Sequence, residues 1–183
     1  MIEEPISGAR APKHEAIWPA DLFERGMGCV VVARFKAGGQ RVEAGVFLLD
    51  VFCLGVKDAF YEDIDRQGYL DLIRGRYESK FPMIPVEPCC ARKLVEQAVA
   101  YAQGLGFAPH PDFKKAARVF GGLKADECGR QFTFGRDGKP FYCSGPNETE
   151  EQSCRIVTQL TRRCGEGNFH YLVGVGEMED PEE

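Results

Sequence analysis

The chain has 183 residues, 44% of them hydrophobic and 28% charged, which is the composition of one globular domain with a sizeable core. No apolar run approaches the roughly 18 residues that a membrane-spanning helix needs, so we expect no membrane contact. The net charge is −5, but the last seven residues hold five acids and no base, which leaves the rest formally neutral. A neutral body gives no overall attraction to nucleic acid.

Composition divides the chain into three predicted segments. Residues 1–22 contain three prolines and no sustained periodicity, which indicates an irregular N-terminal arm. Residues 23–176 are expected to form a single α+β domain, and residues 177–183 a disordered acidic tail. Met1–Pro5 lacks the basic start and the apolar stretch of a signal peptide, so we predict a cytoplasmic protein.

The most apolar part of the chain is expected to supply the central strands. Met27–Phe35 is rich in β-branched residues, and Gly38-Gly39 suits a hairpin turn. The return strand begins at Arg41 and reaches about Leu54, pairing antiparallel with the first strand.

The apolar residues of this second strand do not alternate strictly. Both of its faces must therefore be covered, or a bulge must shift its register near Asp50. Gly55 ends the strand, and Val56–Asp63 is expected to begin a helix.

The remaining elements follow from helical spacing, turn residues and caps. Helices are predicted over residues 66–79, from about 88 to Gly104 or Gly106, over 113–120, and from Asn147 to Gly165. Asp112 is expected to cap the third helix, and Asn147 with Glu150 to form a capping box. Asp137-Gly138 predicts the tip of a β-hairpin between Gln131–Phe134 and Phe141–Cys143, and Phe169–Val175 alternates as a last strand. This order indicates an α+β fold with an antiparallel or mixed sheet of about five strands and three to four packed helices.

Eight cysteines are expected to be free thiols, because they lie in apolar settings and the chain shows no export signal. A zinc site from Cys89, Cys90 and Cys128 with His110 or His170 is the alternative. It is disfavoured because the usual two-residue spacing between cysteine ligands is absent. We therefore expect no metal and no other cofactor.

Three blocks of the sequence resemble those of a family of bacterial hypothetical proteins that carry them in this order. The blocks are Phe52–Asp58 (FCLGVKD), Tyr101–Phe113 (YAQGLGFAPHPDF) and Phe134–Tyr142 (FGRDGKPFY). The resemblance implies a single co-folded unit over roughly residues 27–173. It implies no activity, cofactor or catalytic residue.

The candidate catalytic residues cluster where the second strand ends. Cys53 is a possible nucleophile, with His110 or His170 as its base and Asp50 or Asp58 as the acid that orients the base. Lys57 lies beside them in the sequence. The competing interpretation is that Cys53 is a buried strand thiol between Phe52 and Leu54.

A nuclease-like pattern offers a second hypothesis. Pro111-Asp112 followed by Asp137-x-Lys139 matches a loose arrangement in which carboxylates hold a divalent metal and a lysine supports the attacking water. Turn and cap chemistry explain the same residues, so this hypothesis is disfavoured.

The favoured function is a non-enzymatic, cytosolic interaction or regulatory protein that acts through protein–protein contacts, because no acid, base and nucleophile assemble convincingly. The alternative is a hydrolase or nuclease-like enzyme with a site around Asp50, Cys53, Lys57 and Asp58. The environment of Asp50 separates the two hypotheses. Hydrogen bonds from internal backbone or basic groups would favour the interaction protein, and an opening into a pocket with Lys57 and Asp58 would favour the enzyme.

Overall fold

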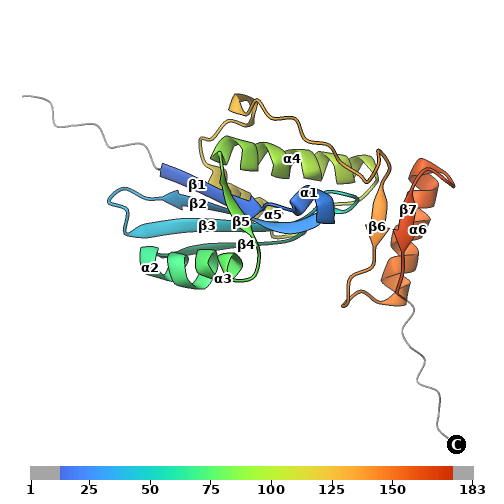
Figure 1. Cartoon of the computed structure of the whole chain (residues 1–183), viewed down its shortest axis with the longest axis horizontal. Coiled ribbons are helices and arrows are strands. Elements are labelled where there is room, and N and C mark those ends of the chain that lie inside the picture. The colour runs from blue at the N-terminus through green and yellow to red at the C-terminus, as the bar shows by residue number, and fades with distance from the viewer. Residues whose placement is uncertain (1–12, 175–183) are drawn as a thin grey trace, which may run out of the picture.

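The computed structural model describes residues 13–174, and its centre is a five-stranded antiparallel sheet with helices on both faces (Figure 1). The strands lie in the order β4-β3-β2-β1-β5. They are β1 (Lys13–Pro19), β2 (Met27–Phe35), β3 (Arg41–Asp50), β4 (Gly55–Asp65) and β5 (Met83–Val86). The predicted α+β fold with a sheet of about five strands is therefore confirmed.

Two helical layers cover the sheet. The first contains α4 (Pro88–Gly104), α5 (Phe113–Ala116) and the 3₁₀ turns η2 (Ala117–Phe120) and η3 (Ala125–Glu127). The opposite face carries α2 (Arg66–Gly68), the π-helical turn η1 (Tyr69–Arg74) and α3 (Gly75–Glu78), which together fill the helix predicted over residues 66–79. The short helix α1 (Leu22–Arg25) links β1 to β2. The described helices include none that is long and apolar enough to cross a membrane.

Strand β3 packs against both layers. Phe47 and Leu49 belong to the core beneath α4, whereas Val42 and Val46 pack with Tyr69 on the other face. The register of β3 against β4 shifts between Leu48 and Leu49, close to Asp50. Coverage of both faces and a register irregularity near Asp50 are both confirmed, and coverage of both faces explains why the apolar residues of β3 do not alternate strictly.

Two segments that the sequence predicted to be an irregular arm and a helix form strands instead. Lys13–Pro19, placed in the irregular arm, forms β1 between β2 and β5, with Trp18 buried in the core. Pro19 is compatible with this strand because it stands at the strand's end. Val56–Asp63, expected to begin a helix, belongs to β4, an edge strand whose outward side tolerates charged residues. Residues 1–12 and the predicted acidic tail, 177–183, lie outside the described residues.

The C-terminal part forms a smaller unit beside one end of the sheet (Figure 1). It consists of β6 (Phe141–Cys143), α6 (Glu150–Cys164) and β7 (His170–Leu172). Strands β6 and β7 pair parallel, which the predicted hairpin did not anticipate. Asp137 and Gly138 do form a tight turn, with φ of 52° and 78° and a bridge between Arg136 and Lys139, but Gln131–Phe134 is not a strand.

The helix caps differ in detail from the predictions. The capping box of α6 is made by Thr149 and Gln152, two residues beyond the predicted pair. The carboxylate of Asp112 makes no capping hydrogen bond to α5. Helices α4, α5 and α6 nevertheless occupy the predicted segments, because their positions follow from apolar spacing rather than from the cap residue alone.

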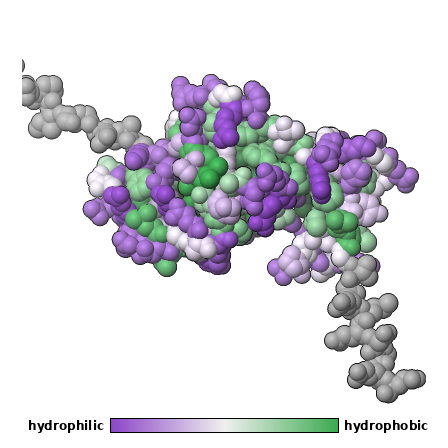
Figure 2. Space-filling model, viewed as in Figure 1, coloured by the Kyte–Doolittle hydropathy of each residue, from purple (hydrophilic) through white to green (hydrophobic). Residues whose placement is uncertain are grey.

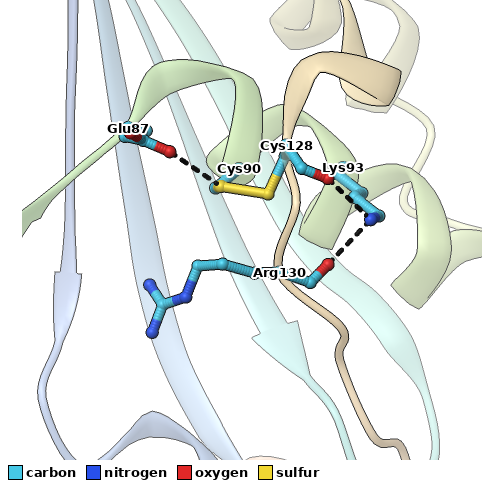
Figure 3. The surroundings of a disulfide bond; sticks show 5 residues. All are labelled: Glu87, Cys90, Lys93, Cys128 and Arg130. Carbon is cyan, nitrogen blue, oxygen red and sulfur yellow. Dashed lines mark hydrogen bonds between the residues drawn. A yellow bond between two sulfur atoms is a disulfide. The ribbon is translucent and has the colours of Figure 1, made fainter.

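The prediction of eight free thiols is wrong for two of them. Cys90, in the first turn of α4, and Cys128, after η3, form a disulfide (Figure 3). Both are buried, and Lys93 holds the second segment in place by donating to the backbone carbonyls of Cys128 (2.9 Å) and Arg130 (2.7 Å). Packing of η3 against α4 brings together two cysteines that are 38 residues apart in the sequence. The other six cysteines are free.

Candidate functional site

The turn after β3 is organised by the buried carboxylate of Asp50. Its Oδ1 accepts hydrogen bonds from the backbone N–H groups of Phe52 (3.0 Å) and Cys53 (2.9 Å). Burial raises the pKa of Asp50 to about 6, although backbone hydrogen bonds and the charge of Lys57 act in the opposite direction. Asp50 therefore has internal backbone partners, which is the environment expected if the chain is an interaction protein.

The three sequence blocks quoted above meet at this turn. The carbonyl of Phe52, in the first block, accepts hydrogen bonds from the hydroxyl of Tyr101 (3.3 Å) in the second and from the N–H of Phe141 (3.1 Å) in the third. The carbonyl of Val51 accepts from the N–H of Gly135 at 3.0 Å. Segments far apart in the sequence thus converge where β3 ends.

Gly55 allows α4 to approach the same turn. Its φ is +68°, and a Cβ at this position would lie 2.7 Å from the backbone carbonyl oxygen of Ala98 and 2.7 Å from the Cβ of Ala102. Both the backbone conformation and the close approach require glycine. Any side chain here would force α4 away from the turn.

Cys53 lacks the environment of a nucleophile. Its side chain is buried in a cluster with Leu105, Tyr142 and Leu160, between the turn and α6. Burial is the main reason that the pKa of its thiol is raised, and the nearby carboxylate of Asp50 adds to the effect. A buried thiol with a raised pKa carries almost no reactive thiolate at neutral pH. The structure therefore matches the interpretation of Cys53 as a packed strand thiol.

An open groove of about 290 Å³ lies next to this turn and contains two of the five candidate residues. Its lining comes from the start of β4, the loop after α4, and α6. The lining residues are Leu54, Val56, Lys57, Phe107, Ala108, Pro109, His110, Pro111 and Ile156. Lys57 and His110 are the only ionisable groups among them. We call this feature the β4 groove.

Lys57 is held in a polar network that joins β4 to the C-terminal unit. Its ammonium group lies 2.8 Å from Glu148, which also accepts a hydrogen bond from the hydroxyl of Tyr142. Tyr142 lies 3.0 Å from the hydroxyl of the buried Ser153. Burial opposes ionisation of Glu148, but its bonds from Lys57 and Tyr142 hold its pKa below the ordinary value. Burial and Glu148 raise the pKa of Tyr142 to about 12.

His110 has a partner at each ring nitrogen. Its Nδ1 lies 3.2 Å from the backbone N–H of Asp112, so Nδ1 is an acceptor and the neutral ring carries its proton on Nε2. Nε2 faces the carboxylate of Asp58 at 3.7 Å. The backbone N–H of His110 donates to the carbonyl of Val56 at 3.0 Å, which fixes the loop against β4. Asp58 and His110 thus form an acid–base pair at the edge of the β4 groove.

The nuclease-like residues have separate local roles. Asp137 stands at the tip of its turn, and Lys139 donates to the backbone carbonyl of Gly167 at 2.9 Å. Asp112 contacts His110 through its backbone N–H. These contacts support the interpretation that the residues of the nuclease-like pattern stabilise local turns and loops.

Sequence reasoning missed Glu148, Tyr142 and Ser153, which connect the predicted Lys57 to the C-terminal unit. It also missed the apolar wall made by Phe107 and Ile156. A usable signal was present in the Tyr101–Phe113 block, which includes most of the loop that lines the groove.

Comparisons with protein-family models, curated proteins and solved structures find no match to this chain. The fold and the site define the protein as a single-domain α+β protein with an open, mainly apolar groove at one end of its sheet.

Proposed function

We propose that this protein is a cytosolic interaction protein, and that a partner protein inserts an apolar side chain of an extended segment into the β4 groove. The observation that carries the proposal is the composition of the groove. Its wall is mostly apolar, and its two ionisable groups, Lys57 and His110, are engaged with Glu148 and Asp58. Exposed apolar surface with a polar rim is a common feature of protein-binding sites.

The size of the groove is compatible with one large apolar side chain. Its volume of about 290 Å³ lies just below the roughly 300–1,000 Å³ of typical small-molecule sites. An extended peptide places alternate side chains on the same face, so one of them can fill such a groove while its neighbours contact the rim.

The hydrolase alternative has one supporting observation, the pair formed by Asp58 and His110. It lacks an available nucleophile at the predicted position, because Cys53 is buried and its pKa is raised. Asp50, the other proposed acid, is engaged with backbone N–H groups. Binding therefore accounts for more of the arrangement than catalysis.

The exposed free thiols support a cytoplasmic location, whereas the Cys90–Cys128 disulfide is more typical of oxidising compartments. Cys143 and Cys154 are exposed and unpaired with one another or with any other cysteine of residues 13–174. Exposed free thiols are typical of proteins in reducing compartments.

Selection of peptides from a displayed random library tests the proposal. We expect the full-length protein to select peptides that share one large apolar residue, with affinities measured by titration calorimetry. Ala108 lines the groove and is exposed, so Ala108→Arg adds a long charged side chain to the site without replacing a core residue. This variant should bind the selected peptides at least roughly tenfold more weakly.

Ala37→Arg is the matched control, because Ala37 is an exposed alanine in the turn at the other end of β3. It should bind like the unmodified protein, and both variants should retain its melting temperature. Equal binding by Ala108→Arg, or the absence of any shared apolar residue among selected peptides, would contradict the proposal.

A further inference from the structure

Potential metal ligands gather around the first turn of α4, away from the residues that line the β4 groove. One ligand atom from each of Glu87, Cys89 and Cys90 lies within 4.8 Å of the other two. Cys90 brings a fourth member, Cys128, through the disulfide (Figure 3). The cluster therefore contains three cysteines and one carboxylate, from two segments of the chain.

The cluster is closed on its inner side and open on its outer side. Cys90 and Cys128 are buried, Cys89 is half-buried, and Glu87 is exposed. A cation could enter from solvent past Glu87 and reach sulfur ligands that are shielded from water. An entry path and a protected ligand set are both requirements of a metal site.

The contact between Glu87 and Cys90 has a donor only in the reduced protein. Glu87 Oε2 lies 3.5 Å from Cys90 Sγ, but a disulfide sulfur has no proton to donate. Reduction would supply an S–H donor, and a shared cation would attract both groups. The backbone of Cys128 has a second anchor besides the disulfide, because Lys93 donates a hydrogen bond to its carbonyl.

We propose that reduction of the Cys90–Cys128 disulfide creates a site for one thiophilic divalent cation of the Zn²⁺ class, bound by Cys89, Cys90, Cys128 and Glu87. Zinc–sulfur bonds of about 2.3 Å in a tetrahedron place sulfur ligands roughly 3.8 Å apart. The ligand atoms of Glu87, Cys89 and Cys90 already lie within 4.8 Å of one another, and the bond to Cys90 places Cys128 beside them.

The two forms differ by two electrons. A dithiol reduces the disulfide to two thiols and is itself oxidised to a disulfide. The thiols of Cys89, Cys90 and Cys128 then release their protons to solvent as the cation binds. Histidines play no part, which distinguishes this site from the zinc site considered from the sequence.

Zinc binding by the full-length protein tests the proposal. After reduction with a phosphine under anaerobic conditions, we expect about one Zn²⁺ per chain by elemental analysis. Bound Zn²⁺ should protect the three proposed cysteines from alkylation, as read by peptide mapping. Cobalt in place of zinc should give the charge-transfer absorption of thiolate ligands.

Cys89→Ser is the informative variant, because it removes a half-buried ligand and leaves the Cys90–Cys128 pair intact. It should weaken Zn²⁺ binding by at least roughly tenfold while its oxidised form melts like the unmodified protein. Cys154→Ser, at an exposed free cysteine of α6, should bind normally. The proposal is overturned if the reduced protein binds no stoichiometric Zn²⁺, if Cys89→Ser binds it unchanged, or if other cysteines are the protected ones.

Discussion

Two buried carboxylates of the sheet, Asp50 and Glu43, have pKa values shifted in opposite directions. Burial raises the pKa of Asp50, whose partners are backbone N–H groups. Burial acts on Glu43 in the same sense, but hydrogen bonds from Tyr61 and Arg34 more than offset it, and the pKa of Glu43 is lowered. The difference is that Glu43 has a cation beside it, whereas Asp50 depends mainly on backbone dipoles.

The stability of the protein should therefore fall as pH rises through the range in which Asp50 ionises in the folded state. A pKa raised from 3.8 to about 6 means that the folded chain holds this proton more tightly than the unfolded chain. The stabilisation is complete below about pH 4 and lost by about pH 6, with a size of about 3 kcal/mol. Asp50→Asn should remove this decline, because an amide does not titrate, and its oxygen can still accept the two backbone hydrogen bonds. Denaturant titrations at several pH values measure the free energy of unfolding of both proteins.

Glu43→Gln is the matched comparison, because Glu43 affects the pH dependence of stability in the opposite direction from Asp50. Because the pKa of Glu43 is lowered in the folded protein, its carboxylate stabilises the fold at pH values above its ordinary pKa of 4.5. This stabilisation is lost as the pH falls below that value. Its amide variant should lose about 1–3 kcal/mol at neutral pH, since Arg34 is left without its partner. If Asp50→Asn keeps the decline between pH 4 and 6, the assignment of that decline to Asp50 is wrong.

At the scale of elements, each outer edge of the sheet has backbone positions that are already bonded or that lack a donor. On β4, the carbonyl of Val56 is bonded to the N–H of His110, and the N–H of Ala59 to the carboxylate of Asp58. On β5, Pro85 has no N–H to donate. Such features discourage addition of a further strand. These features support the proposal that a partner protein binds at the β4 groove rather than at either edge of the sheet.

The disulfide fixes the N-terminal end of α4 to the segment after η3. It closes a loop of 38 residues, for which chain entropy predicts about 4 kcal/mol of stabilisation. Reduction in metal-free buffer should lower the free energy of unfolding by up to that amount, as measured by denaturant titration. Alkylation of the unfolded, unreduced protein should modify six cysteines.

A double Cys90→Ala, Cys128→Ala variant is the control, and its stability should not respond to reductant. Eight alkylated cysteines in the unreduced protein would show that the disulfide is absent in solution.

At the scale of the whole molecule, the C-terminal unit is joined to the sheet through a small core. The cluster that connects it contains five buried residues, against twenty in the cluster between the sheet and α4. The unit therefore has less buried apolar area to hold it in place than the central strands have. On the face shown in Figure 2, hydrophobic residues reach the surface in separate areas between hydrophilic ones.

Native-state hydrogen exchange should detect this difference. Amides of α6 should open with a lower free energy than those of β2 and β3, because local opening costs less where fewer apolar contacts are lost. Leu160→Ala, which removes a buried side chain of the small core, should increase exchange in α6 and leave β2 nearly unchanged. Equal opening free energies in α6 and β2 would show that the two parts unfold together.

The sequence alone determined the elements whose signals are local. The β-branched run of Met27–Phe35 and the Gly38-Gly39 turn predicted β2 and its hairpin with β3, and Pro88 with the apolar spacing after it predicted α4. Broken alternation near Asp50 correctly indicated coverage on both faces and a shifted register. These features depend on neighbouring residues, so periodicity and turn chemistry suffice.

Only the tertiary structure decided the features that join distant segments. Ala16 of β1 pairs with Val32 and with Val86, and no local pattern announces either partner. The same is true of the Cys90–Cys128 pair and of the five candidate site residues, of which Lys57 and His110 reach the β4 groove while Cys53 is covered by α6. Which side chains are buried depends on how elements pack across the fold, and that packing is specified by contacts far apart in the chain.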